Sequence, residues 1–161
     1  MTARVSPAVA DLVAELIRRR WTVATAESLT AGLVCATLTE VPGASAAVRG
    51  GLIVYATELK HTLAGVDADL LAERGAVHPE VAAQLAEGAR RRCGADWGLG
   101  LTGVAGPDPQ DGVEPGTVHL AVAGDGVRTG RTLRVSGARE AVRAAAVAGA
   151  VDLLREQLTA S

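Results

Sequence analysis

Hydroxyl side chains stand at the ends of several expected elements, where they could bind or attack a ligand. Ser28 follows a buried apolar stretch, Thr30 comes two positions later, and Thr102 with Gly103 ends another such stretch. Ligands of α/β sheets bind at the carboxyl ends of strands, beside helix amino termini that attract anions. Ser28 is therefore a candidate ligand contact, although capping of the following helix explains it equally well. Ser45, in a Pro-Gly-Ala-Ser stretch, is typical of a turn.

An amine, a phenol and two guanidinium groups add to this set. Lys60 is the only lysine among 16 basic residues, and Tyr55, the only tyrosine, precedes it by five positions. An amine can lose its proton and act as a base when burial lowers its pKa, whereas a guanidinium group cannot. Arg139 and Arg143 lie on one face of an expected helix because they are four positions apart. They could bind an anion or form an ordinary solvated surface.

Two familiar ligand-binding patterns do not fit. The stretch GLGLTG at 98–103 matches GxGxxG, but it lies within an expected strand and precedes a Gly/Pro loop instead of a helix. His61, His78 and His119 have neither metal-ligand spacing nor a nearby cysteine. His78 fits the entry of a helix, and His119 fits a strand side chain on the less apolar face. We therefore expect no dinucleotide turn, no cofactor and no metal.

Composition narrows the class of protein. The 161 residues predict a single domain over 1–161, with 48% hydrophobic residues to fill a core. A net charge of -2 and only 2% aromatic residues argue against nucleic-acid binding. Two isolated cysteines, and the lack of a signal peptide or a long apolar run, predict a cytoplasmic protein without membrane contact.

Hydrophobic periodicity and turn residues predict alternating helices and strands. Helices are expected over 7–20, 29–40, 57–64, 67–74, 79–93 and 138–158, and strands over 21–26, 50–56, 96–104, 116–123 and 127–135. The last two strands are joined by Gly124-Asp125-Gly126, which is typical of a hairpin. This order predicts a three-layer α/β/α sandwich with a mixed sheet of about five strands.

The ordered set of short motifs resembles one known family. The blocks TAESLTAG, PGAS, GGLIVYATELK, GAVHPEV, LTGVAGPD, GTV and SGAREAVR, from about Leu12 to Leu158, are similar to the C-terminal domain of the competence/damage-inducible protein CinA. Stand-alone members of that family are nicotinamide mononucleotide deamidases. The resemblance implies a metal-independent amidohydrolase, acting as a homodimer, that releases ammonia from nicotinamide mononucleotide in pyridine-nucleotide salvage.

The resemblance also implies which residues form the site. The positions that match the family's pattern are Ser28, Thr30, Ser45, Tyr55, Lys60, Thr102, Gly103, Gly106 and Arg139, with Arg143 as second choice for the arginine. Three departures stand out. Ala31 replaces a glycine of the family's TGG block, Asp108-Pro109-Gln110 replaces a glycine-rich continuation, and His78 replaces a serine.

Amide hydrolysis needs a nucleophile, a base, donors for the oxyanion and an acid for the departing ammonia. We expect Lys60 as the base, Ser45 as the nucleophile, Ser28 as a carboxamide contact and Tyr55 as the group that orients Lys60 or shuttles a proton; Ser28 stays open as the nucleophile. Arg139 suits a phosphate. Two other functions remain: a pyridine-nucleotide sensor without catalysis, and a competence or DNA-damage accessory protein that works by protein contacts.

Overall fold

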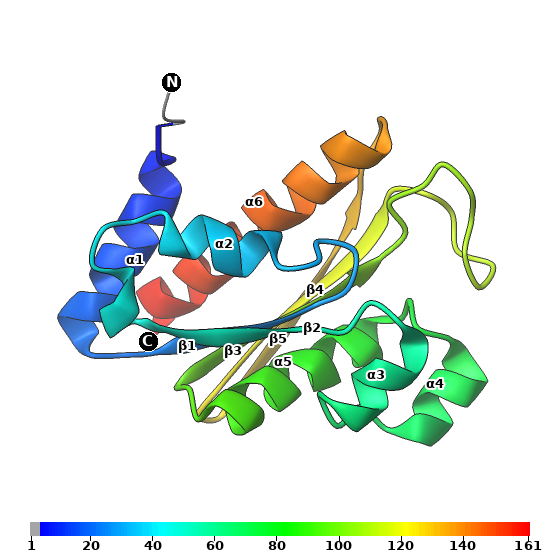
Figure 1. Ribbon diagram of the computed structural model, residues 1–161, viewed down its shortest axis with the longest axis horizontal. Coiled ribbons are helices and arrows are strands. Elements are labelled where there is room, and N and C mark those ends of the chain that lie inside the picture. Colours follow the sequence, from blue (N-terminus) through cyan, green and yellow to red (C-terminus); the bar gives the residue numbers. More distant parts are fainter. Residues whose placement is uncertain (1–3) are drawn as a thin grey trace.

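A five-stranded sheet organises residues 4–161, the part of the chain that the computed structural model describes (Figure 1). The strands are β1 (Val23–Glu27), β2 (Val48–Ile53), β3 (Trp97–Gly103), β4 (Thr117–Gly124) and β5 (Val127–Arg134). The helices are α1 (Pro7–Arg19), α2 (Leu33–Thr39), the 3-10 turn η1 (Ala44–Ala46), α3 (Thr57–Thr62), α4 (Ala68–Arg74), α5 (Pro79–Cys93) and α6 (Arg139–Ala160). No helix within 4–161 combines the length and hydropathy that a membrane crossing requires.

The strand order decides where loops gather. The order is β2-β1-β3-β4-β5, with β2, β1 and β3 parallel and with β4 antiparallel to both of its neighbours. The first three strands therefore end at one edge of the sheet, and β5 runs in their direction again. As a result α6, which follows β5, begins at that same edge. The expected three-layer α/β/α architecture with a mixed five-stranded sheet is confirmed.

Helices cover both faces of the sheet. In Figure 1, α1, α2 and α6 lie above it, and α5 lies below it with α3 and α4 beside it. Close approach of α5 depends on two glycines of β3. A Cβ added to Gly98 would stand 2.0 Å from the carbonyl oxygen of Ala86, and one added to Gly100 would stand 2.2 Å from that of Ala82. The first two glycines of the GxGxxG match thus serve helix–sheet packing, and the segment does not form a phosphate-binding turn.

The helix expected over 29–40 is four residues shorter at its start. It begins at Leu33, and its N-cap is Gly32, so capping by Ser28 is wrong. Ala31 and Gly32 adopt left-handed backbone angles, with φ of 47° and 97°, which a right-handed helix cannot include. The segment 28–32 is therefore a turn that carries Ser28 at the end of β1.

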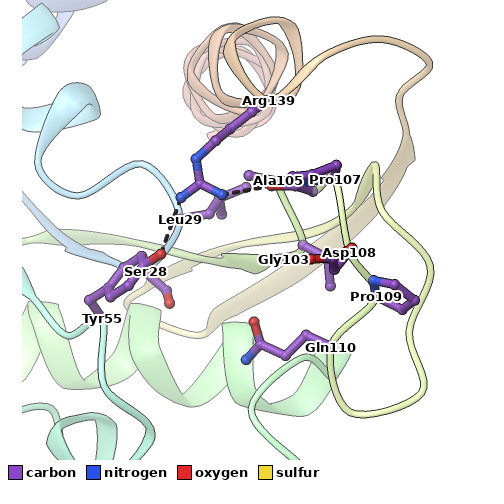
Figure 2. A pocket seen from close by; sticks show the side chains of 12 residues that line it. Ser28, Leu29, Tyr55, Gly103, Ala105, Pro107, Asp108, Pro109, Gln110 and Arg139 are labelled. Carbon is purple, nitrogen blue, oxygen red and sulfur yellow. Dashed lines mark hydrogen bonds between the residues drawn. The ribbon is translucent and has the colours of Figure 1, made fainter.

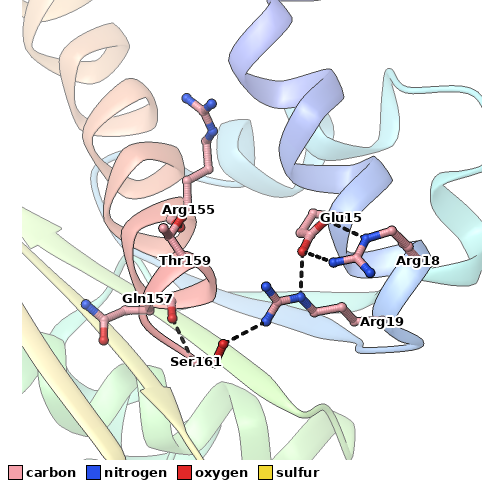
Figure 3. Close-up of polar contacts among 7 residues, drawn as sticks. All are labelled: Glu15, Arg18, Arg19, Arg155, Gln157, Thr159 and Ser161. Atoms are coloured by element: carbon pink, nitrogen blue, oxygen red, sulfur yellow. Dashed lines mark hydrogen bonds and ion pairs between the residues drawn. The ribbon is translucent and has the colours of Figure 1, made fainter.

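The terminal helices α1 and α6 meet at the opposite edge of the sheet (Figure 3). Glu15 accepts hydrogen bonds from Arg18 and Arg19 at 2.5 Å each, and these contacts lower the pKa of its carboxyl group to about 2. Arg19 Nη1 also donates to the carbonyl oxygen of Ser161 at 3.4 Å. The charged groups named here pair within α1, and Arg19 also connects the end of α1 to the end of α6.

Candidate active site

A pocket of about 440 Å³ opens at the carboxyl ends of β1 and β3 (Figure 2). Its wall is formed by Ser28, Leu29, Tyr55, the loop residues 103–110 and Arg139. The volume lies in the range of small-molecule sites, and the position is where α/β sheets bind ligands. Five expected site residues meet here, namely Ser28, Tyr55, Gly103, Gly106 and Arg139.

Ser28 offers a free hydroxyl to this pocket. It follows β1 directly and its side chain is largely buried, at 7% exposure. Its backbone N–H donates to the carbonyl oxygen of Leu101 at 3.1 Å, which ties it to β3. Within residues 4–161 no side chain or carbonyl hydrogen-bonds its Oγ atom, which faces the pocket in Figure 2. The backbone of Ser28 is therefore held to β3, and its hydroxyl is available to a ligand.

A buried carboxylate holds the turn that carries Ser28. Glu27 is 1% exposed, and it accepts hydrogen bonds from Thr25 Oγ1 at 2.9 Å and Thr30 Oγ1 at 2.8 Å. It also accepts the N–H groups of Val34 and Cys35 at the start of α2, at 2.8 and 3.0 Å. Thr30 thus acts behind the pocket wall, not in it. The sequence reasoning missed Glu27, although a carboxylate just before a helix amino terminus is a recognisable signal.

Arg143 supports the same turn from α6. Its Nε atom donates to the carbonyl oxygen of Leu29 at 2.9 Å, and its Nη2 atom approaches that of Thr30 at 3.4 Å. These contacts draw the 28–32 turn onto α6. Arg143 therefore positions the turn instead of lining the pocket.

Lys60 is a buried amine beneath the loop that carries Tyr55. Its side chain is 1% exposed, and Nζ donates to the carbonyl oxygens of Val54 at 2.9 Å and Tyr55 at 3.2 Å. Burial lowers the pKa of Lys60 to about 8, against the attraction of the Asp111 and Glu58 carboxylates, which raises it. About a tenth of the amine is then unprotonated at neutral pH. Within residues 4–161 it makes no hydrogen bond to Ser28 and does not line the pocket.

Arg139 forms the rim of the pocket. Its Nη1 atom donates to the carbonyl oxygen of Gly106 at 2.7 Å, and its Nη2 atom donates to the phenol oxygen of Tyr55 at 3.2 Å (Figure 2). Tyr55 is 59% exposed. The phenol of Tyr55 therefore orients the arginine, and it is the backbone carbonyl of Tyr55 that meets Lys60. A guanidinium group has five N–H donors, so Arg139 keeps donors for an anion.

The end of β3 and the loop that follows it need small or hydroxylated residues for packing and hydrogen bonding. A Cβ added to Gly103 would stand 2.7 Å from the carbonyl oxygen of Thr117, so this position packs against β4. Gly106 has a φ of 90°, and its carbonyl oxygen is the acceptor for Arg139. Thr102 is buried and donates to the carbonyl oxygen of Ala76 at 2.7 Å, so it anchors the neighbouring α4–α5 connection.

Ser45 lies away from this pocket. It is exposed in η1, at the amino end of β2, whereas Lys60 follows the carboxyl end of that strand. A strand of six residues spans about 20 Å at 3.3 Å per residue. The expected pairing of Ser45 with Lys60 is therefore not formed within one chain.

Two of the three histidines, His78 and His119, behave as structural residues. His78 caps α5, because its Nδ1 atom accepts the N–H of Glu80 at 3.1 Å, which confirms the expected helix entry. His119 lies in β4 and contacts Thr132 Oγ1 at 2.9 Å. Burial lowers the pKa of His119.

Comparisons with known proteins show which family the chain belongs to. The CinA C-terminal domain family matches residues 6–158. A CinA-like protein of Frankia casuarinae is 50% identical over 143 residues, which are 89% of this chain and 33% of that relative. A CinA-like protein of Gloeobacter violaceus is 42% identical over 146 residues, 89% of this chain and 34% of the relative. The chain thus spans about a third of the length of the curated relatives it matches.

Solved structures share the whole fold. A CinA superfamily protein from Klebsiella pneumoniae superposes with a TM-score of 0.93 at 31% identity, covering 99% of this chain and 100% of that one. The competence/damage inducible protein CihA from Agrobacterium tumefaciens gives a TM-score of 0.89 at 32% identity, covering 98% and 99%. On the matched family and these likenesses, the chain belongs to the CinA C-terminal domain family.

Proposed function

We propose that the protein is an amidohydrolase that converts nicotinamide mononucleotide to nicotinic acid mononucleotide and ammonia. One observation carries the proposal: the free hydroxyl of Ser28 faces a pocket whose rim is the cationic Arg139, with the buried amine of Lys60 under the adjoining loop. Membership of the family adds support. The reaction needs a nucleophile, a base and an anion-binding group, and these three residues supply the matching chemistry.

In the proposed reaction Ser28 is the nucleophile. Its Oγ atom attacks the carboxamide carbon, and its proton passes to the unprotonated amine of Lys60, directly or through one water molecule. The tetrahedral intermediate collapses by breaking the carbon–nitrogen bond, and the Lys60 ammonium returns the proton to the leaving nitrogen, so ammonia departs. Water then hydrolyses the acyl-Ser28 ester, which gives the carboxylic acid and restores the serine.

The phosphate of the substrate is assigned to Arg139. This residue opens α6, a helix of 22 residues whose amino terminus has no side-chain cap. Unpaired N–H groups and the helix dipole favour an anion there, and a guanidinium group binds phosphate well. The contacts to Gly106 and Tyr55 hold the guanidinium group at the rim.

Two further parts of the proposal concern the setting. A homodimer is supported by exposed apolar side chains that gather around the edge strand β2 and α3, namely Leu33, Ile53, Tyr55, Leu59 and Leu63. A cytoplasmic location is supported by the free thiols of Cys35 and Cys93, because such thiols persist in a reducing compartment.

The deciding experiment is ammonia release from nicotinamide mononucleotide by the wild type and by Lys60→Ala, with a chelator present. We expect wild-type turnover to fall by about a hundredfold or more in the variant, the usual contribution of a general base. Lys60→Arg is the matched control, because it keeps the charge and removes the base, so near-normal turnover in it would contradict the mechanism.

The same assay separates the other functions. Nucleotide binding by calorimetry without ammonia release from the wild type would favour a sensor. Neither binding nor release would favour an accessory protein that works through protein contacts.

A further inference from the structure

The pocket loop ends in a tight turn. Gln110 and Val113 exchange backbone hydrogen bonds of 3.1 and 2.8 Å, and the two residues between them, Asp111 and Gly112, have φ angles of 50° and 75°. Positive φ at both central positions defines a type I′ turn, for which Asp-Gly is a favoured pair. The turn therefore fixes the backbone at Gln110 and so the direction of its side chain.

Asp111 fastens this turn to the rest of the molecule. Its Oδ2 atom accepts the N–H of Ala76 at 3.2 Å, and the carbonyl oxygen of Ala76 accepts Thr102 Oγ1 at 2.7 Å. Ala76 is 1% exposed. The neighbouring Gly75 packs against the carboxylate, because a Cβ added there would stand 3.0 Å from Oδ2. One peptide segment thus connects the end of β3 to the tip of the loop.

Gln110 presents its side chain to the pocket. It lines the cavity, and its amide extends in Figure 2 toward the side where Ser28 lies. Within residues 4–161 no protein group hydrogen-bonds this amide. A primary amide carries two N–H donors and one acceptor oxygen, so Gln110 brings a complete pair of hydrogen-bonding functions to the ligand.

We propose that Gln110 hydrogen-bonds the carboxamide of the substrate and distinguishes it from the carboxylate of the product, with Asp111 as the positioning residue that aims it. This inference rests on the proposed function. A carboxamide can accept from the Gln110 amino group and donate to its oxygen at the same time. A carboxylate has no donor, so the Gln110 oxygen would face another acceptor, and the product would leave more readily.

The first test compares the two ligands. Calorimetry with nicotinamide mononucleotide and with its acid, in the Lys60→Ala protein whose turnover is expected to be at least about a hundredfold slower, gives the ratio of the two dissociation constants. Gln110→Ala is expected to reduce the preference for the carboxamide by about tenfold, the equivalent of one lost hydrogen bond. Glu114→Ala, an exposed residue of the same loop outside the pocket, should leave it unchanged.

Two results would overturn the role of Gln110. Equal weakening of both ligands by Gln110→Ala would mean that it contacts a part they share, and no weakening would mean that it contacts neither. If Lys60→Ala fails to fold, KM for the carboxamide and the inhibition constant of the acid, measured with Lys60 intact, give the same ratio.

The second test concerns Asp111 as the positioning residue. Asp111→Ala removes the acceptor for Ala76, so it should raise KM about as much as Gln110→Ala does, and the double variant should be no worse than either single one. Asp111→Asn keeps an acceptor oxygen but removes the charge that attracts the Lys60 ammonium. It should keep the KM of the wild type and move the pH midpoint of kcat downward. Additive losses in the double variant would contradict the role of Asp111.

Failure of this inference and failure of the proposed function look different. A wild type without turnover that still binds both ligands leaves the ratio measurable, so Gln110 is tested regardless. Turnover that is normal, together with an unchanged ratio in Gln110→Ala, would reject the inference alone.

Discussion

The polar groups at the amino ends of β1 and β3 are hydrogen-bonded differently from those at the carboxyl ends, which form the opposite edge of the sheet. At the amino end of β1 and β3, the Asp96 carboxylate accepts the N–H of Thr22 at 2.8 Å and its Oγ1 at 3.1 Å, and that Oγ1 in turn accepts the N–H of Asp96 at 3.1 Å. Arg49 Nε donates nearby to the carbonyl oxygen of Cys93 at 3.0 Å. The hydrogen bonds of these groups are made within the protein, so the groups at this edge stabilise the fold.

At the carboxyl edge the supporting groups are satisfied and the presented ones are free. Glu27, Thr102 and Arg143 each bind neighbouring protein atoms, whereas the Ser28 hydroxyl and the Gln110 amide face the pocket. Polar groups left without a protein partner, but held by ones that have several, are what a preorganised ligand site requires. The comparison therefore predicts that the polar groups at one edge serve stability and that those at the other edge bind a ligand.

The largest test of this division uses the two candidate serines. Ser28→Ala removes the hydroxyl in the pocket and should lower kcat for ammonia release at least about a thousandfold, as loss of a nucleophile does. Ser45→Ala changes an exposed turn at the other edge and should leave kcat within about twofold. Steady-state ammonia release by both variants is the measurement.

Equal loss of kcat in both variants would contradict the prediction that, of the two serines, only Ser28 acts in the pocket of its own chain. Ser45 could then reach the pocket only from a second copy, since its own β2 separates it from Lys60. Mixing Ser28→Ala with Lys60→Ala protein would not distinguish the cases, but mixing Ser28→Ala with Ser45→Ala protein would. Recovered activity in that mixture would show that the serines act across the dimer.

A smaller effect is the pH dependence of the reaction. Because burial lowers the pKa of Lys60 to about 8, kcat/KM should rise about tenfold per pH unit below that value and level off above it. Glu58→Gln removes an exposed carboxylate that raises the pKa of Lys60, so it should move the midpoint slightly downward. A flat profile across this midpoint would remove Lys60 from the role of base.

The same shift acts on stability. The pKa of Lys60 is lower in the folded protein than in the unfolded chain, where it is about 10.4, so the unfolded chain binds more protons between those values. The free energy of unfolding should therefore gain a contribution from Lys60 as the pH rises through this window. Lys60→Met should lack that contribution.

Most of the fold followed from periodicity and turn residues, because long elements such as α5 and α6 and the β4–β5 hairpin carry strong local signals. The start of α2 did not, since the backbone of Ala31 and Gly32 is set by Glu27 and Arg143, which lie before it and far along the chain. Helix propensity depends on the local sequence, so it does not predict the effect of such contacts.

Individual residues of the candidate site could be predicted from the sequence, but which of the candidates meet in space could not. Ser28, Tyr55 and Arg139 were singled out and meet at the pocket, because the carboxyl ends of parallel strands share an edge. Ser45 was singled out too and lies elsewhere, because it precedes β2 whereas Lys60 follows it, and the resemblance that paired the two residues does not take account of the strand between them. Gln110 was noticed only as a departure from the family, and its direction depends on a turn fastened to Ala76.

The smallest test compares strain at the two edges. Ala31, beside Ser28, has a φ of 47°, and Arg20, after α1 at the amino edge, has a φ of 58°. Left-handed backbone costs a non-glycine residue about 1 kcal/mol, part of which glycine offsets by its flexibility in the unfolded chain. Ala31→Gly and Arg20→Gly should each raise the free energy of unfolding by up to about 1 kcal/mol in denaturant titrations. Only Ala31→Gly should also change kcat, because it loosens the turn that fixes Ser28, and an equal change in kcat from Arg20→Gly would mean that the two edges are not independent.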